Sequence, residues 1–246
     1  MRRHLLPASA LAVLVLSGCG DGSPMFGSDT ETEAVGETED TQDTGTSDPE
    51  AAALDCEEPP SPPAEPLSFT PEDLPEPHPG EPATVTATLA TTCGDIVLEL
   101  AAADAPQTVA SFQFLAQEGY WDDSPCHRLT TQGIFVLQCG DPTGTGQGNP
   151  GYGYGIENAP ADGTYPAGTL AMARTQDPQS NGGQFFVVWE DSQLPTQGGG
   201  YSIFGRVTEG LDVVRAIAAQ GVEGGAADGA PAQPVSILKV EVDEGR

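Results

Sequence analysis

Apolar and polar side chains alternate in short runs over the C-terminal two thirds of the chain. Residues 85–90 and 96–100 alternate in this way around a turn at residues 93–95, so we expect two strands joined as a hairpin. Further runs of strand type follow around Arg128 and at residues 135–138, 169–173, 184–188, 202–207 and 235–242. The pattern predicts a mainly β domain.

Two other runs have apolar residues at helical spacing. Pro106 suits the first turn of one helix and Gly119 suits its end, and residues 211–219 form the second. The long stretch 143–155 is rich in glycine and is expected to be a loop. Many strands, two helices and glycine-rich loops indicate a closed or nearly closed antiparallel barrel.

The chain starts with a short basic leader and an apolar run over residues 5–16. That run is too short to span a bilayer core of ~30 Å and is typical of a secretory signal. Residues 16–19 read Leu-Ser-Gly-Cys, which matches the bacterial lipobox. We therefore expect a lipoprotein signal peptide over 1–18, lipidation of Cys19, and a protein anchored in the cell envelope that faces the periplasm or the exterior. An ordinary signal peptide with an incidental cysteine is the alternative.

Residues 19–82 are acidic and rich in proline, and residues 20–82 contain no lysine or arginine. Such a segment cannot bury enough apolar surface to offset the entropy lost on ordering, so we expect a disordered tether before a globular domain over 83–246. The whole chain has 37 acidic and 8 basic side chains, a formal net charge of −29. This balance argues against nucleic acid and against an anionic membrane surface as partners, so that the membrane is reached through the lipid anchor alone. We expect a monomer.

The candidate chemistry lies in two stretches. Residues 126–141 contain Arg128, an apolar run and Gln138 on two segments separated by a tight turn, and residues 181–189 add Gln184 and a second aromatic run. An arginine, two glutamines and several phenylalanines describe an apolar pocket with donors at its rim. The histidines are scattered, so we expect no metal site, and alternation places His127 on the face opposite Arg128 in a structural role.

These motifs resemble those of the cyclophilins, a family of peptidyl-prolyl isomerases. The likeness is carried by His-Arg at 127–128, Phe-x-x-Gln-x-Gly-Asp at 135–141, Asn-Gly-Gly-Gln-Phe-Phe at 181–186 and Phe-Gly-Arg-Val at 204–207. It extends from about residue 84 to 242 in the order of the family. It implies a closed eight-stranded antiparallel barrel with two capping helices, a peptide site on the outside of the barrel, no cofactor, and proline-containing polypeptides as partners.

The resemblance also implies roles for single residues. Arg128 would donate a hydrogen bond to the proline nitrogen as the amide twists, and Gln138 would orient it or the substrate. The proline pocket and peptide-holding positions would be Phe135, Val136, Phe186, Gln184, Leu194, Tyr201 and the backbone of Ala173 and Arg174. The chain departs from the family by two extra residues in the turn after Arg128, and by Val136 for Met, Arg174 for Asn, Leu194 for Trp and Tyr201 for His. The family tryptophan that Leu194 replaces donates a hydrogen bond to cyclosporin, so tight cyclosporin binding is not expected.

Four cysteines remain beyond Cys19, and an even number in an exported chain suggests two disulfides. Cys126 and Cys139 flank a turn between neighbouring antiparallel strands, which suits a bridge and leaves Cys56 to pair with Cys93. Buried free thiols are the alternative.

The leading hypothesis is a prolyl isomerase for exported proteins. A binding module or holdase that uses the same groove without turnover, and a purely structural Arg128, stay open as alternatives. A thiol redox protein would need a cysteine pair of depressed pKa, and only Arg128 is a cation near one.

Overall fold

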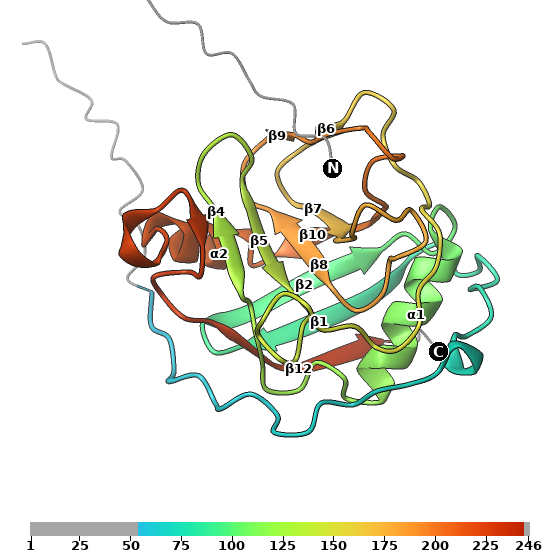
Figure 1. The fold of residues 1–246 in the computed structure, drawn as a ribbon, viewed down its shortest axis with the longest axis horizontal. Coiled ribbons are helices and arrows are strands. Elements are labelled where there is room, and N and C mark those ends of the chain that lie inside the picture. The colour runs from blue at the N-terminus through green and yellow to red at the C-terminus, as the bar shows by residue number, and fades with distance from the viewer. Residues whose placement is uncertain (1–53, 244–246) are drawn as a thin grey trace, which may run out of the picture. The chain divides into compact units, whose positions relative to one another are not determined.

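The computed structural model describes residues 54–243, so the signal peptide, Cys19 and the first part of the expected tether lie outside the described residues. Strands pair antiparallel in one curled sheet in the order β11-β4-β5-β8-β7-β10-β2-β1-β12-β3 (Figure 1). A second sheet joins β6 and β9. The strands are β1 (Val85–Thr91), β2 (Gly94–Leu100), β3 (Ser124–Pro125), β4 (Arg128–Thr130), β5 (Val136–Cys139), β6 (Thr164–Tyr165), β7 (Thr169–Met172), β8 (Phe185–Val188), β9 (Ser192–Gln193), β10 (Ile203–Glu209), β11 (Asp228–Gly229) and β12 (Ser236–Asp243).

The mainly β architecture with two helices is confirmed. The sheet has ten strands where eight were expected, because the two-residue strands β3 and β11 extend its two edges. Strands this short hold too few residues for an alternating pattern, and β6 and β9 were missed for the same reason. The sheet curls until its two ends meet on one segment of the chain, because residues 124–130 pair with β12 through β3 and with β5 through β4.

Both expected helices are present. Helix α1 (Pro106–Gln117) buries Val109, Phe112 and Leu115 and has no side-chain cap of its own. The carboxylate of Glu157 takes that place, since it accepts the N–H groups of Gln107 (3.0 Å) and Thr108 (2.8 Å) at the positive end of the helix dipole. Helix α2 (Leu211–Ala219) follows β10 directly. No helix within residues 54–243 is long and apolar enough to cross a membrane.

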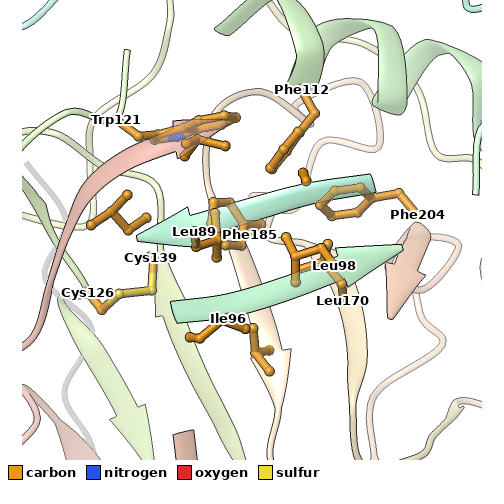
Figure 2. Packing of buried hydrophobic residues seen from close by; sticks show 14 of the residues in the cluster. Leu89, Ile96, Leu98, Phe112, Trp121, Cys126, Cys139, Leu170, Phe185 and Phe204 are labelled. Carbon is orange, nitrogen blue, oxygen red and sulfur yellow. A yellow bond between two sulfur atoms is a disulfide. The ribbon is translucent and has the colours of Figure 1, made fainter. Parts of the chain in front are cut away.

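The core fills the concave side of the sheet. Figure 2 shows Phe112 and Trp121 packed with Phe185 and Phe204 of β8 and β10, their ring centroids 4.7–6.5 Å apart. The same side holds the disulfide between Cys126 and Cys139, and a second disulfide joins Cys56 to Cys93. The expected cysteine pairing is therefore confirmed.

Residues 54–82 differ from the expected free tether, because they lie along the domain. Phe69 packs edge-on against Phe114 of α1 with the centroids 4.9 Å apart, and its N–H donates to the carbonyl of Pro150 (2.7 Å). Farther along, the His78 N–H donates to the carbonyl of Pro106 (2.9 Å). In Figure 1 this blue-to-teal segment follows the lower rim of the domain to the short helix η1 (Pro71–Asp73). The acidic and proline-rich composition hid a few apolar anchors and a disulfide, which together order the segment.

Replacing Phe69 by alanine should lower the free energy of unfolding by about 2 kcal/mol, since the ring is half-buried between aromatic neighbours. Leu67→Ala is the matched control, because Leu67 is 46% exposed and should cost less than about 0.5 kcal/mol. Urea unfolding of both variants measures the difference. Equal stabilities would mean that the segment is not held against the domain.

Candidate active site

A row of side chains crosses four neighbouring strands on the outer face of the sheet. Arg128 of β4 is paired with Gln138 of β5, Gln138 with Phe186 of β8, and Phe186 with Ala171 of β7. Paired residues of antiparallel strands project to the same side, so these four share one face. Their neighbours Leu137 and Val187 point the other way, into the core.

This outer face carries an apolar cluster separate from the core. It consists of Val136, Tyr165, Ala171, Phe186, Val188 and Leu194, with Ile134, Ala173, Tyr201 and Ile203 packed around it. Over this cluster lies a hollow of about 460 Å³. Its floor is apolar, from Val136, Phe186 and Leu194, and its rim carries Arg128, Gln138 and Arg174. A hollow with an apolar floor and polar groups at its border suits a small apolar ring that is attached to a polar amide.

The guanidinium of Arg128 is held on two edges. Its Nε and Nη2 atoms donate to the two carboxylate oxygens of Asp228, both at 2.8 Å, and Nη1 donates to Oε1 of Gln138 at 3.1 Å. Hydrogen bonding to Asp228 raises the pKa of Arg128, and Arg128 in turn lowers the pKa of Asp228. Three of the five guanidinium N–H groups are thereby used, which leaves one on each Nη atom for a ligand.

A relay of amides continues from the arginine to the loop beyond. Gln138 accepts from Arg128 with its oxygen and donates with Nε2 to Oε1 of Gln184 (2.9 Å). Gln184 then donates to the carbonyls of Gly146 (3.2 Å) and Gly148 (2.8 Å). Each amide oxygen accepts from the preceding residue of the relay, and each amide nitrogen donates to the next one. The relay therefore turns the oxygen of Gln138 toward Arg128.

The loop that receives this relay is folded around the buried carboxylate of Asp141. The carboxylate accepts from the N–H (2.8 Å) and hydroxyl (2.7 Å) of Thr143 and from the N–H of Gly148 (3.0 Å). Burial would raise the pKa of Asp141, but these hydrogen bonds together lower it. Only glycine fits at 148, because a Cβ there would lie 1.8 Å from Oδ1 of Asp141.

Most of the residues predicted for the site are brought together. The hollow is lined by Arg128, Val136, Gln138, Ala173, Arg174, Phe186, Leu194 and Tyr201, and Gln184 lines an adjoining hollow of about 170 Å³. The N–H of Ala173 donates to the carbonyl of Gln184 (3.0 Å), and this hydrogen bond joins the two peptide-holding segments.

Phe135 is not part of the hollow. Its ring packs against Trp189 with the centroids 5.0 Å apart, and Ile134 lines the hollow instead. Alternation explains the difference, because Phe135 precedes the outward-facing Val136 and so faces the other way. The lengthened turn adds Ile134 at this border, and its N–H closes a tight turn onto the carbonyl of Gln132 (2.9 Å).

Two ionisable side chains at the hollow, His127 and Asp228, were not predicted for the site. His127 borders it, although alternation placed it on the opposite face, because it precedes β4 and the strand period does not reach it. Asp228 was missed altogether, since a single aspartate in a glycine- and alanine-rich loop has no pattern that links it to an arginine 100 residues away. Burial lowers the pKa of His127, while Asp141 opposes the shift.

The fold and site together define a class of protein: a curled antiparallel sheet with a filled interior that offers an arginine-bordered apolar hollow on its outer face. Residues 86–242 match the family described as cyclophilin type peptidyl-prolyl cis-trans isomerase/CLD. The chain therefore belongs to the cyclophilin-type peptidyl-prolyl cis-trans isomerase family.

Relatives cover the domain to different extents. The chain is 42% identical over 205 residues to a protein named probable peptidyl-prolyl cis-trans isomerase B of Mycobacterium tuberculosis, covering 76% of this chain and 64% of that protein. It is 39% identical over 168 residues to peptidyl-prolyl cis-trans isomerase cyp18 of Streptomyces antibioticus, covering 64% of this chain and 98% of that protein. A crystal structure of a cyclophilin type isomerase from Cryptosporidium parvum superposes with a TM-score of 0.56 and 27% identity, covering 66% of this chain and 99% of the other. A second structure of that protein was solved in the presence of the dipeptide Ala-Pro.

Replacing Asp141 by asparagine should lower the free energy of unfolding at pH 7 by about 2 kcal/mol, because an amide places N–H groups against donors that the carboxylate satisfied. The folded-state pKa of Asp141 is lowered from 3.8, so its contribution is present above pH 3.8 and disappears as the pH falls below that value. The stabilities of the wild type and the variant should therefore converge in acid.

Asp177→Asn is the matched control, since its side chain accepts one backbone N–H, from Gln179 (2.9 Å), in an exposed turn. It should cost less than about 0.5 kcal/mol. Urea unfolding between pH 3 and 7 measures all three proteins. An Asp141→Asn difference that stays constant over this range would contradict the assignment of the effect to the carboxylate.

Proposed function

We propose that this protein catalyses cis–trans rotation about Xaa-Pro bonds. The observation that carries the proposal is the Arg128 guanidinium, which borders an apolar hollow and keeps one N–H on each Nη atom beyond those used by Asp228 and Gln138. Membership in the isomerase family supports it. The chain spans 64% of the length of the first relative described above, so the activity is argued from the site itself.

The reaction needs no nucleophile. Resonance holds the Xaa-Pro amide planar with a barrier of ~18–20 kcal/mol, and twisting the bond halfway localises the lone pair on the proline nitrogen. A donor aimed at that nitrogen stabilises the twisted state more than the planar one, and this difference lowers the barrier. Each ~1.4 kcal/mol gained in this way raises the rate tenfold.

The side chains of the hollow divide this task. Val136, Phe186 and Leu194 hold the proline ring by apolar contact, so the proline side of the bond stays still while the other side turns. Arg128 supplies the donor and cannot lose its proton at any working pH. The relay through Gln138 and Gln184 holds the guanidinium at the border of the hollow, so little reorganisation accompanies the twist.

We also propose that the protein is an envelope lipoprotein that acts on exported polypeptides. A lipobox ending at Cys19, a basic leader and a short apolar run support the lipid anchor. Two disulfides within the described residues agree with an oxidising compartment.

Arg128→Ala should lower kcat/KM for a proline peptide by about a hundredfold, the typical loss for one donor that acts on the transition state. Arg206→Ala is the matched control, because Arg206 is likewise ion-paired on the outer surface (to Glu99, 2.9 Å) and lies away from the hollow. It should leave kcat/KM within twofold. NMR exchange spectroscopy on a short peptide containing an Ala-Pro bond measures both.

The same experiment separates the enzyme from a binding module. A wild type that shifts the peptide's resonances on titration but does not speed exchange would be a proline-peptide binder or holdase. An Arg128→Ala variant as fast as the wild type would remove Arg128 from the mechanism.

Anchoring is tested in cells. In a bacterial host that processes lipoproteins, the wild type should incorporate labelled palmitate and sediment with membranes, while Cys19→Ala should do neither. A Cys19→Ala protein that still fractionates wholly with membranes would contradict the anchor.

A further inference from the structure

The two arginines at the border of the hollow differ in their charge balance. Arg128 is matched by the carboxylate of Asp228. Arg174 has no carboxylate within 4 Å among the described residues. Its guanidinium donates three hydrogen bonds to neutral main-chain carbonyls: Nε to Gly200 (2.7 Å), Nη1 to Thr175 (2.9 Å) and Nη2 to Gln197 (3.2 Å).

Three carbonyls and one aromatic ring hold the Arg174 guanidinium in place. Its central carbon lies 5.1 Å from the centre of the Tyr201 ring, at a distance typical of a cation–π contact. The side chain is half-buried. Two of its five N–H groups, one on each Nη atom, are not used by these carbonyls.

Arg174 is also where three hollows meet. It lines the hollow over Phe186, the adjoining one next to Gln184, and a third one of about 570 Å³ beside Pro195 and Gln197. Among the residues that line these three hollows, Asp228 is the one acidic side chain, and Arg128 neutralises it. In a chain with 37 acidic and 8 basic side chains, this stretch of groove is therefore locally cationic.

We propose that the Arg174 side chain selects substrates that carry an acidic residue next to the isomerised proline. A peptide whose proline occupies the hollow places a neighbouring residue near Arg174, because the two features share one wall. A carboxylate there gains a charge-assisted hydrogen bond with a donor already held in place, whereas an ammonium meets an uncompensated cation. This inference rests on the proposed function and deepens it by naming a substrate class.

The test compares six peptides of one length. Three have Glu, Gln or Lys immediately before the proline and a neutral residue after it, and three have these residues immediately after it. At about 0.15 M ionic strength the Debye length is ~8 Å, so the overall negative charge of the chain is largely screened at the groove. NMR exchange gives kcat/KM for each peptide, and chemical-shift titration gives its affinity.

At one of the two positions the wild type should prefer Glu over Lys by about fivefold or more and Glu over Gln by about twofold. Arg174→Gln should bring the Glu to Lys ratio of kcat/KM to about one, and because the readout is a ratio within one variant, a rate change common to all the peptides cancels. Arg215→Gln is the matched control. Arg215 also donates to a main-chain carbonyl (Nε to Trp189, 3.1 Å) and has no carboxylate within 4 Å in the part of the chain that the structure describes. It lies on α2 away from the three hollows, so the ratio should not change.

The outcomes distinguish this inference from the proposed function. Equal rates for Glu and Lys peptides at both positions, or a preference that persists in Arg174→Gln, would overturn the inference and leave the isomerase intact. If no peptide is isomerised, the proposed function fails, and the affinities of the Glu and Lys peptides still decide whether Arg174 selects acidic segments.

Discussion

A filled sheet interior forces the site onto the outer face. Strands β5, β7 and β8 each carry apolar residues on both faces, with Leu137 and Val187 directed to the core and Val136 and Phe186 directed outward. Since the interior is packed with aromatic rings, the apolar surface of the proposed site is the second, smaller cluster on the outside. A large apolar patch exposed on a sheet face favours association with other proteins, and here the loops around residues 146 and 200 border the patch and leave a hollow.

The interaction between Arg128 and Asp228 has two consequences for this hollow. The bidentate carboxylate fixes the plane of the guanidinium, so the N–H groups that remain unused point in a fixed direction before a substrate binds. It also balances the charge, so the arginine can act as a hydrogen-bond donor without attracting every acidic segment. An exposed ion pair of this kind adds little to stability, so its value lies in geometry.

Periodicity and motifs allowed much of this to be predicted. The main strands, both helices, the two disulfides and eight residues of the hollow follow from alternation, cysteine spacing and the family resemblance. Asp228 could not be predicted, because its role arises only when a loop 100 residues along the chain returns to β4. The family resemblance placed Phe135 in the pocket, but in the structure the alternation of side chains turns Phe135 away from Val136 and onto Trp189.

The segment before the barrel shows how composition can mislead. Its average proline and acid content predicts disorder, yet a few strongly stabilising contacts are enough to order the segment. The Phe69 ring packs against Phe114 of α1, and the Phe69 N–H donates to the carbonyl of Pro150. Pro150 follows closely on Gly148, whose carbonyl accepts from Gln184. Because the loop is folded from inside by Asp141 and braced from outside by Phe69, the relay that orients Arg128 ends on a fixed support. The segment outside the family match thus contributes to the geometry of the hollow.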